Sequence, residues 1–134
     1  MENNVILNKI AIIERCINRV YEVYEENPLN LEDYTKQDSI VLNIQRACEA
    51  TIDLAMHICA KKGLGVPQAS KDAFLFMKDK NMISKSLTDK MVNMIGFRNI
   101  LVHDYQEINL NILQSIVEDE LEDLKEYTKI ILKI

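Results

Sequence analysis

A short motif in the last third of the chain carries the side chains best suited to chemistry. Arg98, Asn99, His103 and Tyr105 fall within eight residues, among mostly apolar neighbours. A histidine imidazole exchanges protons near neutral pH, and an arginine guanidinium holds an anion such as phosphate through two parallel hydrogen bonds. An amide beside the arginine can orient the histidine or the bound anion. The motif is therefore a candidate site for proton transfer at a bound anion.

The spacing of these residues leaves several arrangements open. On a helix, Asn99 and His103 share one face, whereas Arg98 and His103 lie about 140° apart around the axis. Arg98 and His103 can converge only if the helix unwinds near Val102 or if a second copy of the chain supplies the partner group. A purely structural explanation also fits, with Arg98 at the surface and His103 bonded to the last carbonyls of the helix. Spacing alone does not choose between these arrangements.

The chain around the motif has the periodicity of helices. Apolar residues recur every three or four positions, which predicts one helix over about 5–24, a second over about 35–62 and a last helix that opens near Asn109. Between them we expect a short helix capped by Ser70 and a fourth helix that opens in a capping box at 86–89. Gly63 is the expected C′ residue of the second helix. With only 3 glycines and 2 prolines, the chain lacks material for the many turns of a β-sandwich. We predict an all-α fold, an up-and-down helical bundle of four to five helices, in a single domain over residues 1–134.

The charge balance limits how the protein could contact nucleic acid. There are 21 acidic and 16 basic residues, for a formal net charge of −5. Broad attraction to nucleic acid needs a basic surface, so any such contact must be local. The acidic run 118–120 in the last predicted helix is expected to be a solvated face.

Cysteine usage and hydropathy indicate a cytoplasmic protein. Cys16, Cys48 and Cys59 cannot all pair within one chain, and no secretory leader is visible, so we expect a reducing compartment. The three thiols fall on apolar stripes and are expected to be buried. No apolar stretch approaches the roughly 18–20 residues that span a bilayer. His57 and Cys59 point away from each other on a helix, and we expect no metal site and no cofactor.

The motif resembles the signature of the HEPN superfamily, in which arginine is followed by a polar residue, three further residues and histidine. Arg98, Asn99 and His103 fit each position. His103 and Tyr105 add a histidine-any-tyrosine extension that is similar to the HepT-like ribonuclease toxins, which are paired with a minimal nucleotidyltransferase antitoxin. The resemblance covers nearly the whole chain, including the long first helix, the Gly-Val-Pro loop and the amphipathic last helix.

The resemblance implies a metal-independent endoribonuclease that works as a homodimer, with two motifs facing each other across the interface. Arg98 would hold the phosphate, His103 would move protons as the 2′-hydroxyl attacks its own phosphodiester, and Asn99 would orient His103 or the phosphate. It also implies that the antitoxin adenylylates Tyr105, so that a bulky anion blocks the phosphate site. Two Arg98 side chains in one dimer would form a small positive centre on an acidic molecule.

Two other functions are compatible with the sequence. Bundles of this kind also serve as nucleotide-binding or substrate-binding partners of nucleotidyltransferases, in which case Arg98 and His103 would hold a phosphate without cleaving it. The chain could also be a structural dimerisation bundle without a ligand. The complete arginine–polar–three–histidine pattern, followed by Tyr105, favours the ribonuclease toxin.

Overall fold

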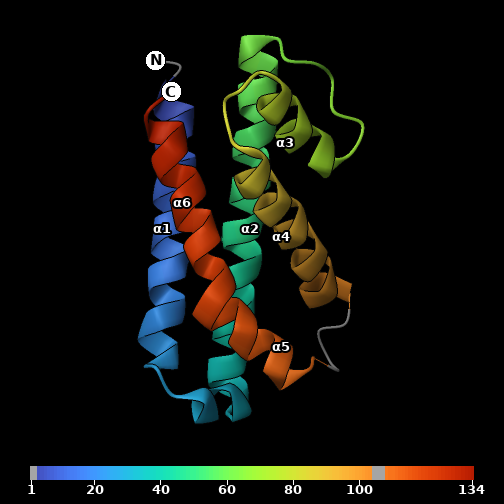
Figure 1. The fold of residues 1–134 in the computed structure, drawn as a ribbon. Coiled ribbons are helices and arrows are strands. Elements are labelled where there is room, and N and C mark those ends of the chain that lie inside the picture. Colours follow the sequence, from blue (N-terminus) through green and yellow to red (C-terminus); the bar gives the residue numbers. More distant parts are fainter. Residues whose placement is uncertain (1–2, 104–107) are drawn as a thin grey trace.

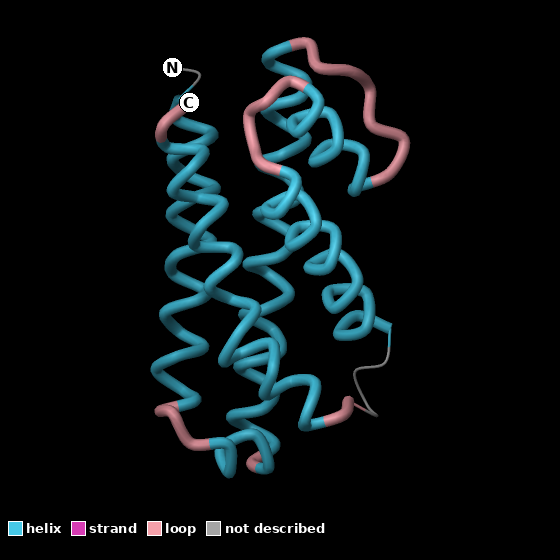
Figure 2. Tube along the Cα trace, viewed as in Figure 1, coloured by secondary structure: helices cyan, strands magenta, loops and turns pink. Residues whose placement is uncertain are grey.

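The structure, a computed structural model, describes residues 3–103 and 108–134, and this part of the chain is helical apart from short connections (Figure 2). It contains no strand within those ranges, which confirms the predicted all-α fold. In chain order the elements are α1 (Asn3–Tyr24), η1 (Pro28–Glu32), α2 (Tyr34–Lys62), α3 (Ser70–Asp79), α4 (Lys85–His103), α5 (Leu110–Ser115), η3 (Ile116–Glu120) and α6 (Leu121–Leu132).

Helices α1, α2, α4 and α6 form the body of the bundle (Figure 1). Helices α1 and α2 are antiparallel and pack along their length, α6 lies against α1, and α4 packs against both α2 and α6. The short α3 covers α2 and α4 near one end, and η1 makes the turn from α1 to α2 at the other end. The start of α1 and the end of α6 lie close together (Figure 1). None of the described helices is long and apolar enough to cross a membrane.

The apolar stripes predicted from the sequence form the shared core. The apolar stripe of α1 is buried at Ile10, Ile13, Ile17, Val20 and Tyr24. All three cysteines are also buried, and they are free thiols as predicted. The core contains an edge-to-face pair of Phe74 and Tyr127 with ring centroids 5.5 Å apart, and the Tyr127 hydroxyl donates to the Met77 sulfur at 3.3 Å. Such aromatic pairs contribute beyond their burial alone. Helix α3 is therefore held to the last helix through the core.

Local capping sets several helix ends as expected. Helix α2 ends at Gly63, which has the left-handed φ of 64° that favours glycine at this position. The side chain of Asn109 accepts the N–H groups of Asn111 and Ile112 and so opens α5. Both predicted boundaries are confirmed.

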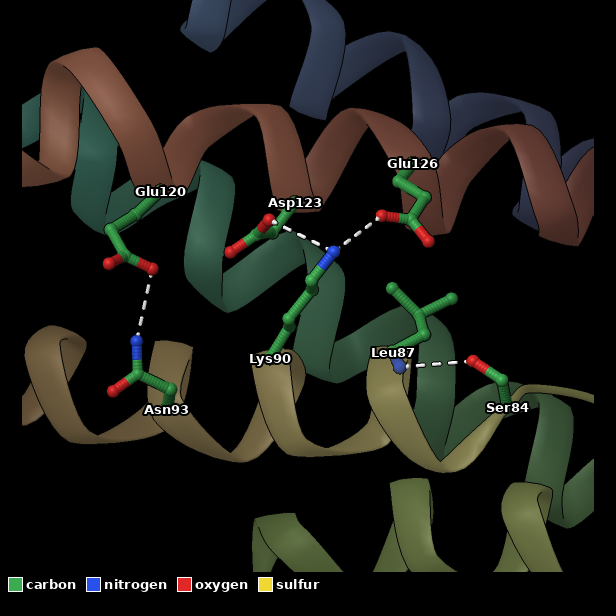
Figure 3. Close-up of polar contacts among 7 residues, drawn as sticks. All are labelled: Ser84, Leu87, Lys90, Asn93, Glu120, Asp123 and Glu126. Atoms are coloured by element: carbon green, nitrogen blue, oxygen red, sulfur yellow. Dashed lines mark hydrogen bonds and ion pairs between the residues drawn. The ribbon is translucent and has the colours of Figure 1, made fainter.

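Two predicted helix starts are wrong. Helix α4 begins at Lys85, because the Ser84 hydroxyl accepts the Leu87 N–H at 3.0 Å (Figure 3). The predicted capping box at 86–89 does not form, since Asp89 pairs with Lys85 at 3.0 Å instead. In α3, Ser70 is the first helical residue rather than the cap.

The start of α3 is stabilised by a carboxylate instead of a hydroxyl. Asp72 accepts the backbone N–H groups of Gln68 and Ala69 at 3.0 and 3.1 Å. An acidic side chain in the first turn is also favoured by the helix dipole.

The last helix is continuous but contains one π turn, η3, between α5 and α6. The acidic run lies in this turn, where Glu118 and Asp119 are exposed, as predicted. Two of its carboxylates nevertheless have partners, because Glu118 accepts a hydrogen bond from the Tyr24 hydroxyl and Glu120 accepts one from Asn93 at 3.0 Å. The run therefore also connects the last helix to its neighbours.

Polar contacts along one side of α4 tie it to the last helix (Figure 3). The Lys90 ammonium lies 3.1 Å from a Glu126 carboxylate oxygen and 3.8 Å from one of Asp123. Asn93 and Glu120 add a second link one turn further along. At such exposed positions each link contributes little to stability, because solvent screens the charges. Together they lie along the side of α4 that faces the last helix.

Candidate active site

The predicted site residues lie on the last two turns of α4. Phe97 and Leu101 are buried against the rest of the bundle. Arg98 is consequently half-buried at the edge of that face, and Asn99 and His103 are exposed. Tyr105 lies outside the described residues.

Arg98 has two described partners. Its Nη1 donates to the Asn99 side-chain oxygen at 3.1 Å, and its Nη2 lies 3.3 Å from a Glu49 carboxylate oxygen on α2. Asn99 therefore contacts Arg98, which sequence reasoning did not anticipate. The arginine Nε is buried without a hydrogen-bond partner among the described residues.

The ion pair with Glu49 is weak enough to exchange. The Arg98 side chain is 30% exposed and that of Glu49 is 51% exposed, and pairs of this kind contribute about 0.2–1 kcal/mol. A phosphate that forms two charge-assisted bonds to the guanidinium binds more strongly. Glu49 is therefore a weakly held counter-ion of Arg98 that a more strongly bound anion would replace.

Helix α4 remains regular through His103. The helix does not unwind at Val102, one of the two routes by which Arg98 and His103 could converge. Within one chain these side chains therefore project about 140° apart around α4.

A buried thiol lies beside this arginine. Cys48 is fully buried on α2, and its burial raises the pKa of the thiol, while the nearby Arg98 charge opposes that shift. The thiol stays protonated at neutral pH and is a poor nucleophile. Among the described residues, no group of three or more histidine, cysteine or acidic side chains is placed to hold a metal ion.

Comparison with known proteins places this geometry in a family. The sequence model of the HepT-like ribonuclease family matches residues 6–131 of this chain. The chain belongs to the HepT-like ribonuclease family. This confirms the resemblance inferred from the motif.

Similar HepT-like proteins are known in both sequence and structure. The chain is 46% identical over 129 residues to the mRNA nuclease HepT of Shewanella oneidensis, which covers 96% of this chain and 97% of that protein. A crystal structure of a toxin–antitoxin with AMP-PNP matches with a TM-score of 0.92 and 45% identity, over 98% of this chain and 100% of that one. A tri-AMPylated S. oneidensis HEPN toxin in complex with MNT antitoxin also matches with a TM-score of 0.92 and 45% identity, over 98% and 99% of the two chains.

Two residues of this HepT-like chain support the motif from α2 and were missed by sequence reasoning. The Gln45 side-chain amide donates to the Leu101 backbone carbonyl at 2.9 Å, and Glu49 pairs with Arg98. The last carbonyls of a helix lack partners within it, so Gln45 supplies one at the end of α4. Gln45 and Glu49 are four residues apart and share one face of α2. Polar side chains flanking the apolar stripe of α2 were the only signal in the sequence.

Removal of the Gln45 amide should loosen the end of α4. For Gln45→Leu we expect the free energy of unfolding to fall by about 1 kcal/mol, the usual contribution of one such bond. We also expect faster hydrogen exchange in the peptide that contains the last turn of α4, measured by mass spectrometry.

Asn43→Leu is the matched control, because Asn43 donates to the Ser39 carbonyl at 2.8 Å within α2 itself. Exchange at the end of α4 should then stay at the parental rate. Equal exchange there in Gln45→Leu and the parent protein would contradict a role for Gln45 in holding that end.

Proposed function

We propose that this protein is a metal-independent endoribonuclease toxin of a toxin–antitoxin pair, with Arg98, Asn99 and His103 as its catalytic residues. The observation that carries the proposal is the position of the motif. It lies on an accessible helix end, with its arginine held by an exchangeable carboxylate, in a chain 46% identical to an mRNA nuclease. That relative makes messenger RNA the first substrate to test. We infer a cytoplasmic location, where messenger RNA and ATP are both present.

The chemistry requires proton transfer and charge stabilisation at one phosphate. The RNA 2′-hydroxyl gives up its proton, its oxygen bonds to the adjacent phosphorus, and the 5′-oxygen leaves with a proton. The products carry a 2′,3′-cyclic phosphate and a 5′-hydroxyl. His103 is the group suited to move these protons, and Arg98 is suited to hold the phosphate oxygens as their charge increases. Asn99 orients the Arg98 guanidinium through the described hydrogen bond.

A homodimer completes the site in this proposal. Arg98 and His103 of one chain project in different directions around α4, so a second copy related by two-fold symmetry would supply the missing group. Exposed apolar side chains flank the motif, with Ile100 at 37% and Val102 at 38% exposure, and such residues favour an interface. Each site would then pair the arginine of one subunit with the histidine of the other.

A minimal nucleotidyltransferase antitoxin is the proposed partner that silences the toxin. Two similar solved structures are toxin–antitoxin complexes, and in one of them the toxin is tri-AMPylated. Tyr105 follows His103 by two residues. Adenylyl groups on Tyr105 would add negative charge and bulk next to the phosphate site, and both effects would exclude RNA.

Loss of either Arg98 or His103 should abolish RNA cleavage. With chelator present and no divalent metal, we expect the parent protein to cut total cellular RNA and leave 2′,3′-cyclic phosphate ends. Arg98→Ala and His103→Ala should each lower the rate by at least about 100-fold. His57→Gln changes the other histidine, on α2, and should cut at the parental rate.

Rapid cleavage by His103→Ala would refute its catalytic role. No cleavage by the parent protein, together with binding of ATP, would instead support the non-catalytic nucleotide-binding function.

Mixing two inactive variants tests whether the site is shared between subunits. After subunit exchange, a hybrid dimer of Arg98→Ala and His103→Ala has one site with both groups intact, so about a quarter of the parental rate should return. The expected quarter follows because half of the dimers are hybrids and each has one active site of two. A site within a single chain would give no recovery, and size-exclusion chromatography with light scattering would establish that dimers form.

Silencing by the antitoxin should depend on Tyr105. The toxin is co-expressed with its proposed partner, the minimal nucleotidyltransferase antitoxin. Intact-mass spectrometry should then show added adenylyl groups on the parent protein and none on Tyr105→Phe. Tyr34→Phe is the control, since Tyr34 is 79% exposed on α2 and outside the motif. An unmodified Tyr105 in a fully silenced complex would show that binding alone silences the toxin.

A further inference from the structure

A hollow of about 540 Å³ adjoins the proposed active site. Helix α4 contributes Val92, Gly96 and Arg98 to its wall, and the start of α3 contributes Ser70 and Lys71. This volume lies in the range of sites that hold small molecules. Because Arg98 lines it, the hollow opens directly from the group proposed to hold the phosphate that is cleaved.

The charges around this hollow favour an anion. Arg98 and Lys71 provide two cations from two different helices, and none of the described side chains that line it is a carboxylate. Two acidic groups that contact its lining residues are already engaged, since Glu49 pairs with Arg98 and Asp72 accepts the N–H groups of Gln68 and Ala69. On a chain of net charge −5, this is a local basic site of the kind that RNA binding requires.

A second hollow of similar size shows the opposite character. It measures about 530 Å³ and is lined by the phenols of Tyr21 and Tyr24 and by the carboxylates of Glu26, Glu118 and Glu122. Burial and the adjacent Glu122 charge raise the pKa of Tyr21 to about 12, so that phenol stays neutral. Three carboxylates repel a phosphate backbone. The hollow beside Arg98 is therefore the one suited to RNA.

Gly96 is an unusual residue for its position. It lies in the interior of α4, where glycine is a poor helix former, and a Cβ placed there would meet no described atom within 4 Å apart from its chain neighbours and the nearby backbone of its own helix. Packing within the chain therefore does not require glycine. The missing side chain leaves bare backbone next to the half-buried Val92 and Ile95. This provides an open, partly apolar surface beside two cations.

We propose that this hollow is an RNA subsite that receives the nucleotide next to the cleaved phosphate. The ribose or base of that nucleotide lies over Gly96, Val92 and Ile95, and Lys71 binds the phosphate on its far side. This proposal rests on the proposed ribonuclease function and adds the path that the strand takes from Arg98 toward α3.

Binding of RNA to variants of an inactive protein tests the subsite. The probe is a fluorophore-labelled single-stranded RNA of mixed sequence, and its Kd is measured by fluorescence anisotropy in the full-length His103→Ala background. Gly96→Leu, which adds a bulky side chain to the lining of the hollow, should raise the Kd by about tenfold or more, and Gly96→Ala should raise it less. Ser86→Leu adds the same side chain to an exposed position of α4 outside the hollow and should keep the parental Kd.

Salt dependence tests the lysine separately. Lys71→Ala should raise the Kd several-fold and lower the slope of log affinity against log salt by at least about 0.7, the value for one phosphate contact on a single strand. Lys71→Arg should restore the slope, and Lys80→Ala, at the other end of α3, should leave it unchanged.

The possible outcomes separate this proposal from the function on which it rests. If Arg98→Ala weakens binding while Gly96→Leu and Lys71→Ala bind like their background, the subsite is refuted and the proposed function stands. If Arg98→Ala also binds normally, the motif does not hold RNA and both fail. If Gly96→Leu turns dimers into monomers in light scattering, the open surface is a contact between copies of the chain, which would also overturn the subsite.

Discussion

The packing of α4 between α2 and the last helix is the constraint on which the proposed site depends. Its inner face buries Met91, Met94 and Leu101, and each such side chain contributes about 1.5–3 kcal/mol. The polar contacts on its flanks contribute less, because they lie at exposed or partly exposed positions. Hydrophobic burial therefore determines where α4 lies and which way it is turned, and the motif residues take the remaining positions at the edge and on the outer face.

The polar contacts have a different role from the apolar ones. Lys90 and Asn93 join α4 to the last helix, whereas Gln45 and Glu49 join the end of α4 to α2. Lys90 and Asn93 make their contacts near the middle of α4, whereas Gln45 and Glu49 contact residues within the motif segment. Because the Glu49 contact is partly exposed, it orients Arg98 and still yields to a stronger anion. This combination suits an arginine that must be held in place before a phosphate arrives.

Electrostatics and shape together explain how an acidic protein can act on RNA. The chain carries a net charge of −5, and the second hollow, between α1 and the last helix, holds three carboxylates that repel a phosphate backbone. Positive charge near the motif comes from Arg98 and Lys71, which belong to helices that meet only through folding. Two cations neutralise few phosphates. Non-specific binding is therefore limited, because it grows with the number of neutralised phosphates.

Local patterns in the sequence were sufficient to predict most of the helices. The stripe of α1, the left-handed Gly63 at the end of α2 and the Asn109 cap all depend on residues within about one turn of each other. The motif and its family could also be recognised from Arg98 to Tyr105. Where two local solutions competed, the prediction failed, as with the Ser84 cap that formed in place of one at Ser86.

The amino-acid sequence by itself thus determined the helical class, most of the helix boundaries and the chemical groups of the motif, because these follow from interactions between near neighbours. Only the tertiary structure decided that Gln45 and Glu49 support the motif, since they lie 56 and 49 residues from their partners. It also decided that α4 stays helical through His103 and that Lys71 lines the same hollow as Arg98. Contacts of this kind depend on how the helices rotate and slide against one another, and that register is set by the packing of the whole core.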